Sequence, residues 1–151
     1  MSTTRITRHL NAPPERVYRA LIDPQAIAEW RVPNGMKCHV HEHDAREGGT
    51  FRVSLTYDAP NAAGKSSAHT DTYHGRFVKL VPGIELVEAM EFETSEPSLQ
   101  GEMTVRYSLS ETDGGTDLFA THEGVPPGVP PADNETGWRM ALDKLAALVE
   151  K

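Results

Sequence analysis

Three histidines at two-residue spacing, His39, His41 and His43, are the first candidates for chemistry in this sequence. Residues two apart on a strand point to the same face, so the three imidazoles would form a row in which two could hold one metal ion. Cys38 and Val40 are the apolar positions of the same segment, which predicts that the histidines face solvent on the outer side of a sheet. A metal site also needs a third ligand and supporting groups, and none is identifiable, so we expect no metal here.

A second set, His69, Asp71 and Tyr73, has the same spacing and shares its strand face with Phe77. If Phe77 points inward, an imidazole, a carboxylate and a phenol reach the interior, and His122 joins them from another apolar strand face. A histidine and a carboxylate in an apolar pocket have displaced pKa values and could transfer protons. The alternative is that His69 and its neighbours are solvated beside a loop, and that His122 is a hydrogen-bonded core residue.

Two positions in the neighbouring strands leave alternatives open. Gly75 marks either a bulge, which would switch the faces of its strand, or a close approach of another strand, so the register there is not fixed. Glu88 interrupts an apolar face that includes Met90. It either pairs with Arg106 on a neighbouring strand or contacts a ligand.

Large, adaptable apolar side chains could line a cavity beside these polar groups. We expect ligand contacts from Trp30, Met36, His69, Asp71, Tyr73, Glu88, Met90, His122 and Trp138. Cys38 is the only cysteine and is expected to be a buried, inert thiol. No nucleophile or phosphate-binding motif is present, so we assign no catalytic residue and no cofactor.

The longest helical pattern, at residues 132–151, is the element around which the others must be arranged. Trp138, Leu142, Leu145 and Leu148 recur at helical spacing and predict one apolar face. Asp133 or Asn134 is suited to cap the start of this helix.

The rest of the chain predicts strands and two short helices. Strands are expected at 3–10, from 36 onward, and at 51–57, 70–80, 84–92, 103–109 and 116–123, with helices at about 12–22 and 24–30 and a loop at 59–67. Tight turns favour an antiparallel sheet, and a twisted sheet of this size curls. The final helix is the element with enough apolar surface to fill the curled face.

Size and composition limit the class of protein. The 151 residues predict one domain, 1–151, and a composition of 38% hydrophobic and 25% charged residues is typical of a globular protein. The net charge of −7 argues against nucleic-acid binding. The absence of a long apolar run and of a signal-peptide core predicts a cytoplasmic protein without a membrane span.

Several segments together resemble the START-like (SRPBCC) superfamily, and within it the branch named after the C-terminal domain of the heat-shock-protein-90 ATPase activator. The segments are APPERVYRALIDPQAIAEW at 12–30, VPNG at 32–35, REGG at 46–49, HGRFVKLVPG at 74–83, GGTDLFATHEG at 114–124 and GWRMALDKLAALVE at 137–150. The resemblance implies an α+β helix-grip fold. In this fold a curved antiparallel sheet of about six to seven strands surrounds a long C-terminal helix, with two short helices between strands 1 and 2.

The resemblance also implies a cavity between sheet and helix, and three functions fit it. Binding of a small apolar or amphipathic ligand is the leading hypothesis. A co-chaperone-like protein-interaction domain and a cyclase or hydrolase that uses cavity acid–base chemistry are the alternatives. A chaperone partner and a homodimer formed through sheet edges stay open, as does the identity of the ligand.

Overall fold

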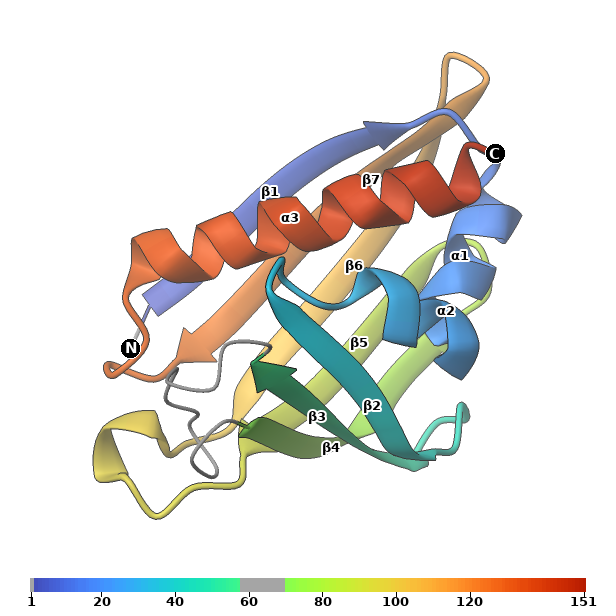
Figure 1. Ribbon diagram of the computed structural model, residues 1–151. Coiled ribbons are helices and arrows are strands. Elements are labelled where there is room, and N and C mark those ends of the chain that lie inside the picture. Colours follow the sequence, from blue (N-terminus) through green and yellow to red (C-terminus); the bar gives the residue numbers. More distant parts are fainter. Residues whose placement is uncertain (1, 58–69) are drawn as a thin grey trace.

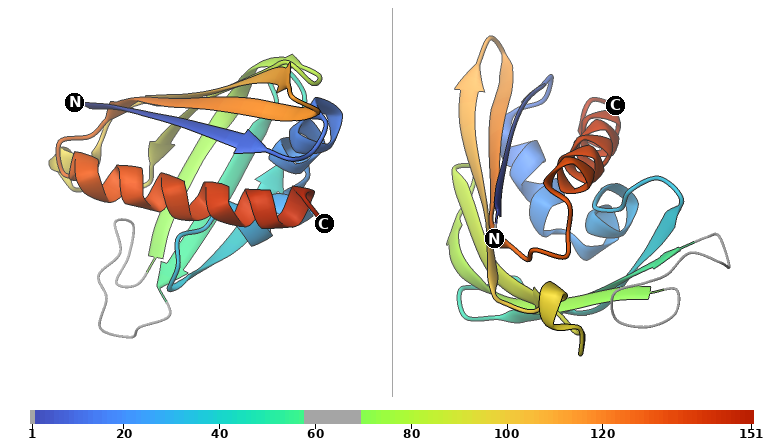
Figure 2. Two further views of the ribbon diagram at one scale, coloured as in Figure 1. Left: turned by 90° about the horizontal axis from the view of Figure 1, so that it is seen from above. Right: turned by 90° about the vertical axis from the view of Figure 1, so that its left-hand side faces the viewer.

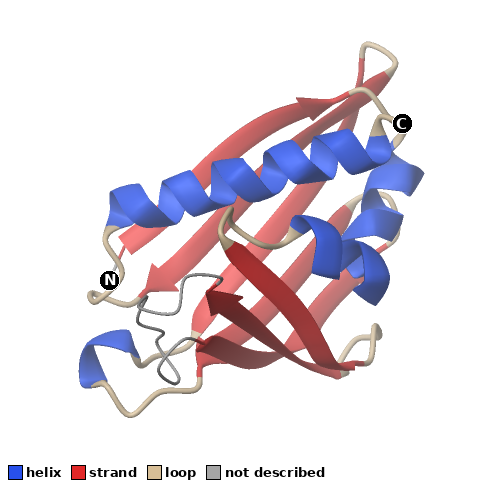
Figure 3. Cartoon of the chain, in the orientation of Figure 1, coloured by secondary structure: helices blue, strands red, loops and turns tan. Residues whose placement is uncertain are grey.

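The computed structural model describes residues 2–57 and 70–151. In chain order the elements are β1 (Ser2–Leu10), α1 (Pro14–Ile22), α2 (Pro24–Trp30), β2 (Met36–His43), β3 (Thr50–Tyr57), β4 (Thr70–Val81), β5 (Glu85–Phe92), a 3₁₀ turn (Pro97–Leu99), β6 (Met103–Thr112), β7 (Gly115–Val125) and α3 (Pro131–Val149) (Figure 3). The predicted loop at 59–67 and His69 lie outside the described residues. No helix of the described part is long and apolar enough to cross a membrane.

The strands form one seven-stranded sheet in the order β1-β7-β6-β5-β4-β3-β2, with antiparallel neighbours throughout. The sheet curves around α3, while α1 and α2 lie between β1 and β2 in the chain and cover one end (Figures 1 and 2). This arrangement confirms the predicted α+β helix-grip fold. The core lies between the concave sheet face and the helices.

The apolar face of α3 packs into this curve as predicted, with Leu142, Leu145 and Val149 buried. The predicted cap is wrong, because α3 begins at Pro131 with Pro130 as the residue before it and no side-chain cap. Proline at the first helical position has a favourable φ and lacks the N–H that a cap would satisfy, so the helix begins earlier than the capping pattern indicates. Asn134 is instead inside the first turns, where its amide donates to Thr4 Oγ1 at 2.9 Å.

Gly75 is a point of close approach and not a bulge. The β4–β5 register runs without interruption from Tyr73 to Phe77, and the irregularity falls between Phe77 and Lys79. A Cβ atom at Gly75 would lie 2.0 Å from the carbonyl oxygen of Ala89. The faces of β4 therefore stay in phase from residue 71 to residue 77, so that Asp71, Tyr73 and Phe77 are all buried.

The histidine run in β2 only partly follows the prediction. His39 and His41 are exposed on the outer side, but a register shift between Val40 and Glu42 turns His43 inward. His43 is partly buried: its Nε2 lies 2.6 Å from the carbonyl oxygen of Ile22, and its ring packs edge-on against the buried ring of Phe77. A bulge changes which residues share a face, so the three imidazoles do not form one row. The described residues contain no group of three potential metal ligands.

Candidate functional site

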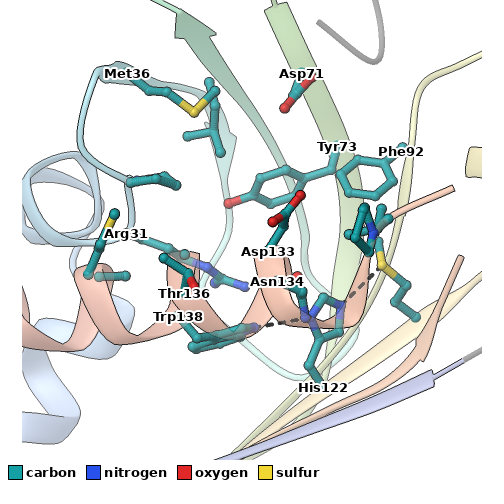
Figure 4. Close-up of a pocket in the computed structure, with 18 of the residues that line it drawn as sticks. Arg31, Met36, Asp71, Tyr73, Phe92, His122, Asp133, Asn134, Thr136 and Trp138 are labelled. Atoms are coloured by element: carbon teal, nitrogen blue, oxygen red, sulfur yellow. Dashed lines mark hydrogen bonds between the residues drawn. The ribbon is translucent and has the colours of Figure 1, made fainter.

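A pocket of about 700 Å³ lies between the concave face of the sheet and the N-terminal half of α3 (Figure 4). The segment that follows α2 contributes to its wall. Its lining residues are Arg31, Pro33, Asn34, Met36, Leu55, Tyr57, Asp71, Tyr73, Met90, Phe92, Leu99, Met103, Val105, His122, Gly128, Val129, Pro130, Asp133, Asn134, Thr136, Gly137, Trp138, Met140 and Ala141. The strands place every second residue on this face, so one set of alternating positions supplies the sheet side of the pocket.

The structure brings six of the predicted ligand contacts into this lining: Met36, Asp71, Tyr73, Met90, His122 and Trp138. Trp30 and Glu88 are not among the lining residues. Trp30 is fully buried, and its indole N–H donates to the carbonyl oxygen of Ala20 at 2.9 Å, so this ring belongs to the core. His69 lies outside the described residues.

Glu88 is buried and pairs with Arg31, a residue that the sequence did not single out. Its Oε1 lies 2.8 Å from Nη1 of Arg31, and its side chain is 2% exposed. The predicted partner Arg106 pairs instead with Glu85 at 2.7 Å. Glu88 is in register with Val105, so the next residue along β6 points to the opposite face of the sheet and cannot reach Glu88.

Arg31 directly follows α2 and extends its guanidinium into the pocket. Its Cζ lies 5.7 Å from the ring centroid of Tyr73 and 5.9 Å from that of Tyr107. Burial acts to lower the pKa of Arg31, but the Glu88 carboxylate and the two phenols outweigh this effect and hold that pKa well above its ordinary value. The sequence did contain a signal for such a cation, because a carboxylate on an inward strand face needs a positively charged partner from the element that covers that face.

His122 is held as a neutral imidazole by donors from α3. Its Nδ1 lies 3.1 Å from the indole nitrogen of Trp138 and 3.2 Å from the amide nitrogen of Asn134 (Figure 4). An indole N–H only donates, so Nδ1 is the acceptor and the proton sits on Nε2, 3.1 Å from the sulfur of Met103. Burial, with a smaller contribution from the Arg31 charge, lowers the pKa of His122 from 6.5 to about 4.

This hydrogen-bonding pattern bears directly on the acid–base hypothesis. The neutral ring has one nitrogen lone pair, on Nδ1, and Trp138 and Asn134 already occupy it. His122 therefore joins β7 to α3, which is the core-histidine alternative raised from the sequence. A ligand in the pocket would meet a ring that is already hydrogen-bonded.

Two other titratable groups of this region, the Tyr73 phenol and the Cys38 thiol, keep their protons at neutral pH. Burial raises the pKa of Tyr73 to about 12, so its hydroxyl is a donor. Partial burial likewise raises the pKa of the Cys38 thiol to about 11, which agrees with an inert thiol, but Cys38 is only partly buried and not fully buried as expected. The Asp71 carboxyl is buried in the lining, with the hydroxyl of Tyr57 at 3.4 Å from its Oδ2. A distance of that length describes a weak hydrogen bond at most.

Solved structures with this architecture include a close relative. Protein CV1439 from Chromobacterium violaceum is 39% identical, with 99% of this chain and 97% of that chain covered and a TM-score of 0.88. The AHSA1-like protein from Aeromonas hydrophila, at 21% identity, covers 99% and 92% with a TM-score of 0.71. Protein NE0264 from Nitrosomonas europaea, at 23%, covers 98% and 94% with a TM-score of 0.72. The last two show the fold alone.

No functionally curated protein matches the chain. The family model described as Activator of Hsp90 ATPase homolog 1-like protein matches residues 11–150. That match spans nearly the whole sequence, and it agrees with the fold and with the resemblance seen in the sequence motifs. The chain therefore belongs to the Activator of Hsp90 ATPase homolog 1-like family of the START-like superfamily.

Proposed function

We propose that this protein binds a small, mostly apolar or amphipathic molecule in the pocket between the sheet and α3. The observation that supports the proposal most directly is the pocket itself, whose volume of about 700 Å³ falls in the range typical of small-molecule sites. Its walls combine methionine, leucine and aromatic side chains with a few polar groups. Methionine and aromatic rings adapt to apolar ligands, and the polar groups can orient them.

The arrangement of α3 supports a binding role over acid–base catalysis. Trp138 and Asn134 come from α3 and engage the acceptor nitrogen of His122, so the helix is locked against the sheet on one side of the pocket. A preformed wall reduces the entropy lost when a ligand binds. A catalytic histidine would instead need its lone pair directed at the substrate.

Gly137 offers a way to fill the pocket without disturbing the fold. It lies in α3 among the lining residues, and a Cβ atom there would have Pro33 Cγ as its nearest neighbour, at an ordinary 3.8 Å. We expect Gly137→Phe to weaken ligand binding by about tenfold or more, because the ring competes for the ligand's volume. The matched control Gly137→Ala adds one methyl group and should change affinity by less than about threefold.

The experiment starts from a thermal-shift screen of wild type with lipids, polyketides and aromatic compounds, followed by calorimetric titration of the hits with both variants. Stabilisation that grows with ligand concentration supports binding to the native state. The proposal fails if no compound stabilises wild type, or if Gly137→Phe binds every hit as tightly as Gly137→Ala does.

The family match motivates a separate assay for a chaperone partner. The cognate Hsp90-type chaperone, with its ATPase rate measured with and without this protein, distinguishes the two functions. Stimulation that persists in Gly137→Phe would favour a protein-interaction role that does not use the pocket. Ligand binding without stimulation would favour the small-molecule role.

A further inference from the structure

The Arg31 guanidinium presents more hydrogen-bond donors to the pocket than its neighbours accept. A guanidinium carries five N–H donors in one plane. Within residues 2–57 and 70–151, its side chain makes two hydrogen-bond contacts, from Nη1 to Glu88 Oε1 at 2.8 Å and from Nη2 to the sulfur of Met90 at 3.9 Å. A thioether sulfur is a weak acceptor. Donor capacity therefore remains for an acceptor atom inside the pocket.

The guanidinium is also held in place before any ligand arrives. Glu88 fixes one edge of its plane, and the rings of Tyr73 and Tyr107 lie within 6 Å of its Cζ, at 5.7 and 5.9 Å. Its side chain is only 12% exposed. A donor that is already ordered and desolvated loses little entropy on binding and forms a strong charge-assisted hydrogen bond.

The polar groups around Arg31 favour an acceptor on the ligand over a donor. The Tyr73 hydroxyl keeps its proton at neutral pH. The nearby imidazole of His122 has its one acceptor nitrogen occupied by Trp138 and Asn134. In Figure 4 the side chains of Arg31, Tyr73, Trp138 and His122 surround the same space, with Arg31 reaching in from the segment after α2. The groups beside the Arg31 guanidinium are therefore mainly donors, while the carboxylates of Asp71 and Asp133 also line the pocket and would repel a negatively charged ligand.

Charge decides which kind of acceptor fits. The buried carboxylate of Glu88 already neutralises the Arg31 charge. A ligand carboxylate would place a second negative charge beside a buried one and would lose its own hydration. A neutral carbonyl oxygen accepts from the same N–H groups without bringing a charge into the pocket.

We propose that Arg31 is a specificity-determining residue that receives a neutral carbonyl oxygen of an otherwise apolar ligand, such as an aryl ketone. This inference rests on the proposed function, because it assigns a polar contact within the same pocket. Arg31 acts here as a binding residue, and no bond to the ligand is made or broken.

Three matched probes test the inference: 2-acetylphenanthrene, 2-isopropenylphenanthrene and phenanthrene-2-carboxylate. The first two have nearly the same shape and differ in C=O against C=CH₂. A charge-assisted hydrogen bond predicts that wild type binds the ketone about tenfold or more tightly than the alkene, and no less tightly than the carboxylate. The infrared carbonyl stretch of the ketone, identified with a ¹³C label, should shift to lower frequency when the ketone is bound.

The variant for this test is Arg31→Met combined with Glu88→Gln, because removing Arg31 alone would leave Glu88 buried without its partner. In the double variant the ketone should bind no more tightly than the alkene, and its carbonyl stretch should no longer shift. The alkene should bind with an affinity within about threefold of that of wild type. The alkene is thus an internal control for an intact pocket.

The outcomes separate this inference from the proposed function. If the compounds of the screen bind wild type but the ketone and alkene bind equally, or the carboxylate binds most tightly, the carbonyl inference is overturned and pocket binding stands. If the double variant keeps the preference for the ketone, the inference is overturned as well. If nothing binds wild type, both proposals fail.

Discussion

Glu88 shows how one charged residue on an inward strand face determines its surroundings. With Arg31 it forms a buried ion pair, and both side chains lose most of their hydration when the protein folds. Arg31→Met should lower the free energy of unfolding by about 3–5 kcal/mol, because it leaves the Glu88 charge unpaired, and adding Glu88→Gln should restore most of that loss. Equilibrium urea unfolding measures both variants.

The partly exposed pair between Arg106 and Glu85 is the control for this prediction. Arg106→Met should cost less than about 1 kcal/mol, because solvent screens a surface pair. Equal losses in Arg31→Met and Arg106→Met would show that the buried pair has no special energetic role.

Tyr107 supplies a second prediction at this scale, since its hydroxyl is buried and has no hydrogen-bond partner among the described residues. Tyr107→Phe should leave stability unchanged or raise it by up to about 1 kcal/mol, because the desolvated hydroxyl returns no hydrogen bond. Thr116→Val is the matched control: its equally buried hydroxyl donates to the carbonyl oxygen of Ala12 at 2.7 Å. That control should lose about 1 kcal/mol. A larger loss from Tyr107→Phe than from Thr116→Val in thermal or urea unfolding contradicts the assignment.

His122 predicts a pH dependence with a definite sign. Burial first, and then Arg31, lower its pKa from 6.5 to about 4, so the unfolded chain binds a proton in a pH range where the folded protein does not. Above pH 6.5 the neutral His122 contributes about 3 kcal/mol to the free energy of unfolding. This contribution is lost as the pH falls from 6.5 to about 4.

Wild type and His122→Gln, unfolded with urea between pH 7.5 and 4, provide the comparison. Glutamine does not titrate, so stability should fall more steeply with acidification in wild type than in the variant. Surface carboxylates titrate in both proteins, and the difference between the two curves isolates His122. Parallel curves would mean that the folded imidazole titrates normally.

At the scale of elements, the close contact between β4 and β5 depends on Gly75. Its missing Cβ would lie 2.0 Å from the Ala89 carbonyl oxygen and 2.8 Å from Met90 Cα, and backbone atoms cannot move aside as a flexible side chain can. Gly75→Ala should therefore destabilise the protein by about 1–3 kcal/mol or more. Gly137→Ala in α3 is the opposite case, because its Cβ atom would make only an ordinary contact with Pro33 Cγ at 3.8 Å, and helix propensity should raise stability by up to about 1 kcal/mol. The two changes in urea midpoint should have opposite signs, and a neutral Gly75→Ala would contradict the close packing.

Local sequence patterns were enough to predict the helices and strands, but not which side of the sheet every residue faces. Alternation identified the strands, and helical spacing identified the buried stripe of α3, because burial imposes those periods on the sequence. The bulge that turns His43 inward leaves no such trace, since inserting one residue changes the face without changing composition. The start of α3 was misplaced because proline can begin a helix without a cap.

The pocket lining was predicted where it depends on strand alternation or, for Trp138, on the helical spacing of α3. Asp71, Tyr73 and His122 follow from their faces, and they do line the pocket. Arg31 could not be predicted in this way, because the path of the chain after α2 brings it to the pocket and its pairing with Glu88 spans 57 positions. Asn134 reaches His122 through a tertiary contact between α3 and β7 that spans 12 positions. Interactions between different segments leave no short-range period in the sequence, and the prediction of the polar side of the pocket was therefore incomplete.

In the molecule as a whole, α3 connects two regions with different roles. Its N-terminal half lines the pocket, and its C-terminal half is attached to the first part of the chain (Figures 1 and 2). Arg8 pairs with Asp143, the Asn11 N–H donates to Glu150 at 2.9 Å, and Arg16 donates to the Val149 carbonyl oxygen at 3.2 Å. These contacts close the fold, because they join β1 and α1 to the last turns of the chain.

Deleting residues 149–151 therefore tests whether the two ends of α3 are separable. The deletion removes the buried Val149 side chain and the two hydrogen bonds to Asn11 and Arg16, and should lower the free energy of unfolding by about 3 kcal/mol. Gly137 lies about 18 Å along the helix from residue 149 at the rise of an α-helix, so pocket affinity measured well below the melting temperature should change by less than about threefold. Glu150→Ala, which loses only the Asn11 bond, should show a smaller stability loss and the same affinity. A deletion that weakens ligand binding without lowering stability would mean that the last turn of α3 contributes to the pocket, so that the two ends of the helix could not be assigned separate roles.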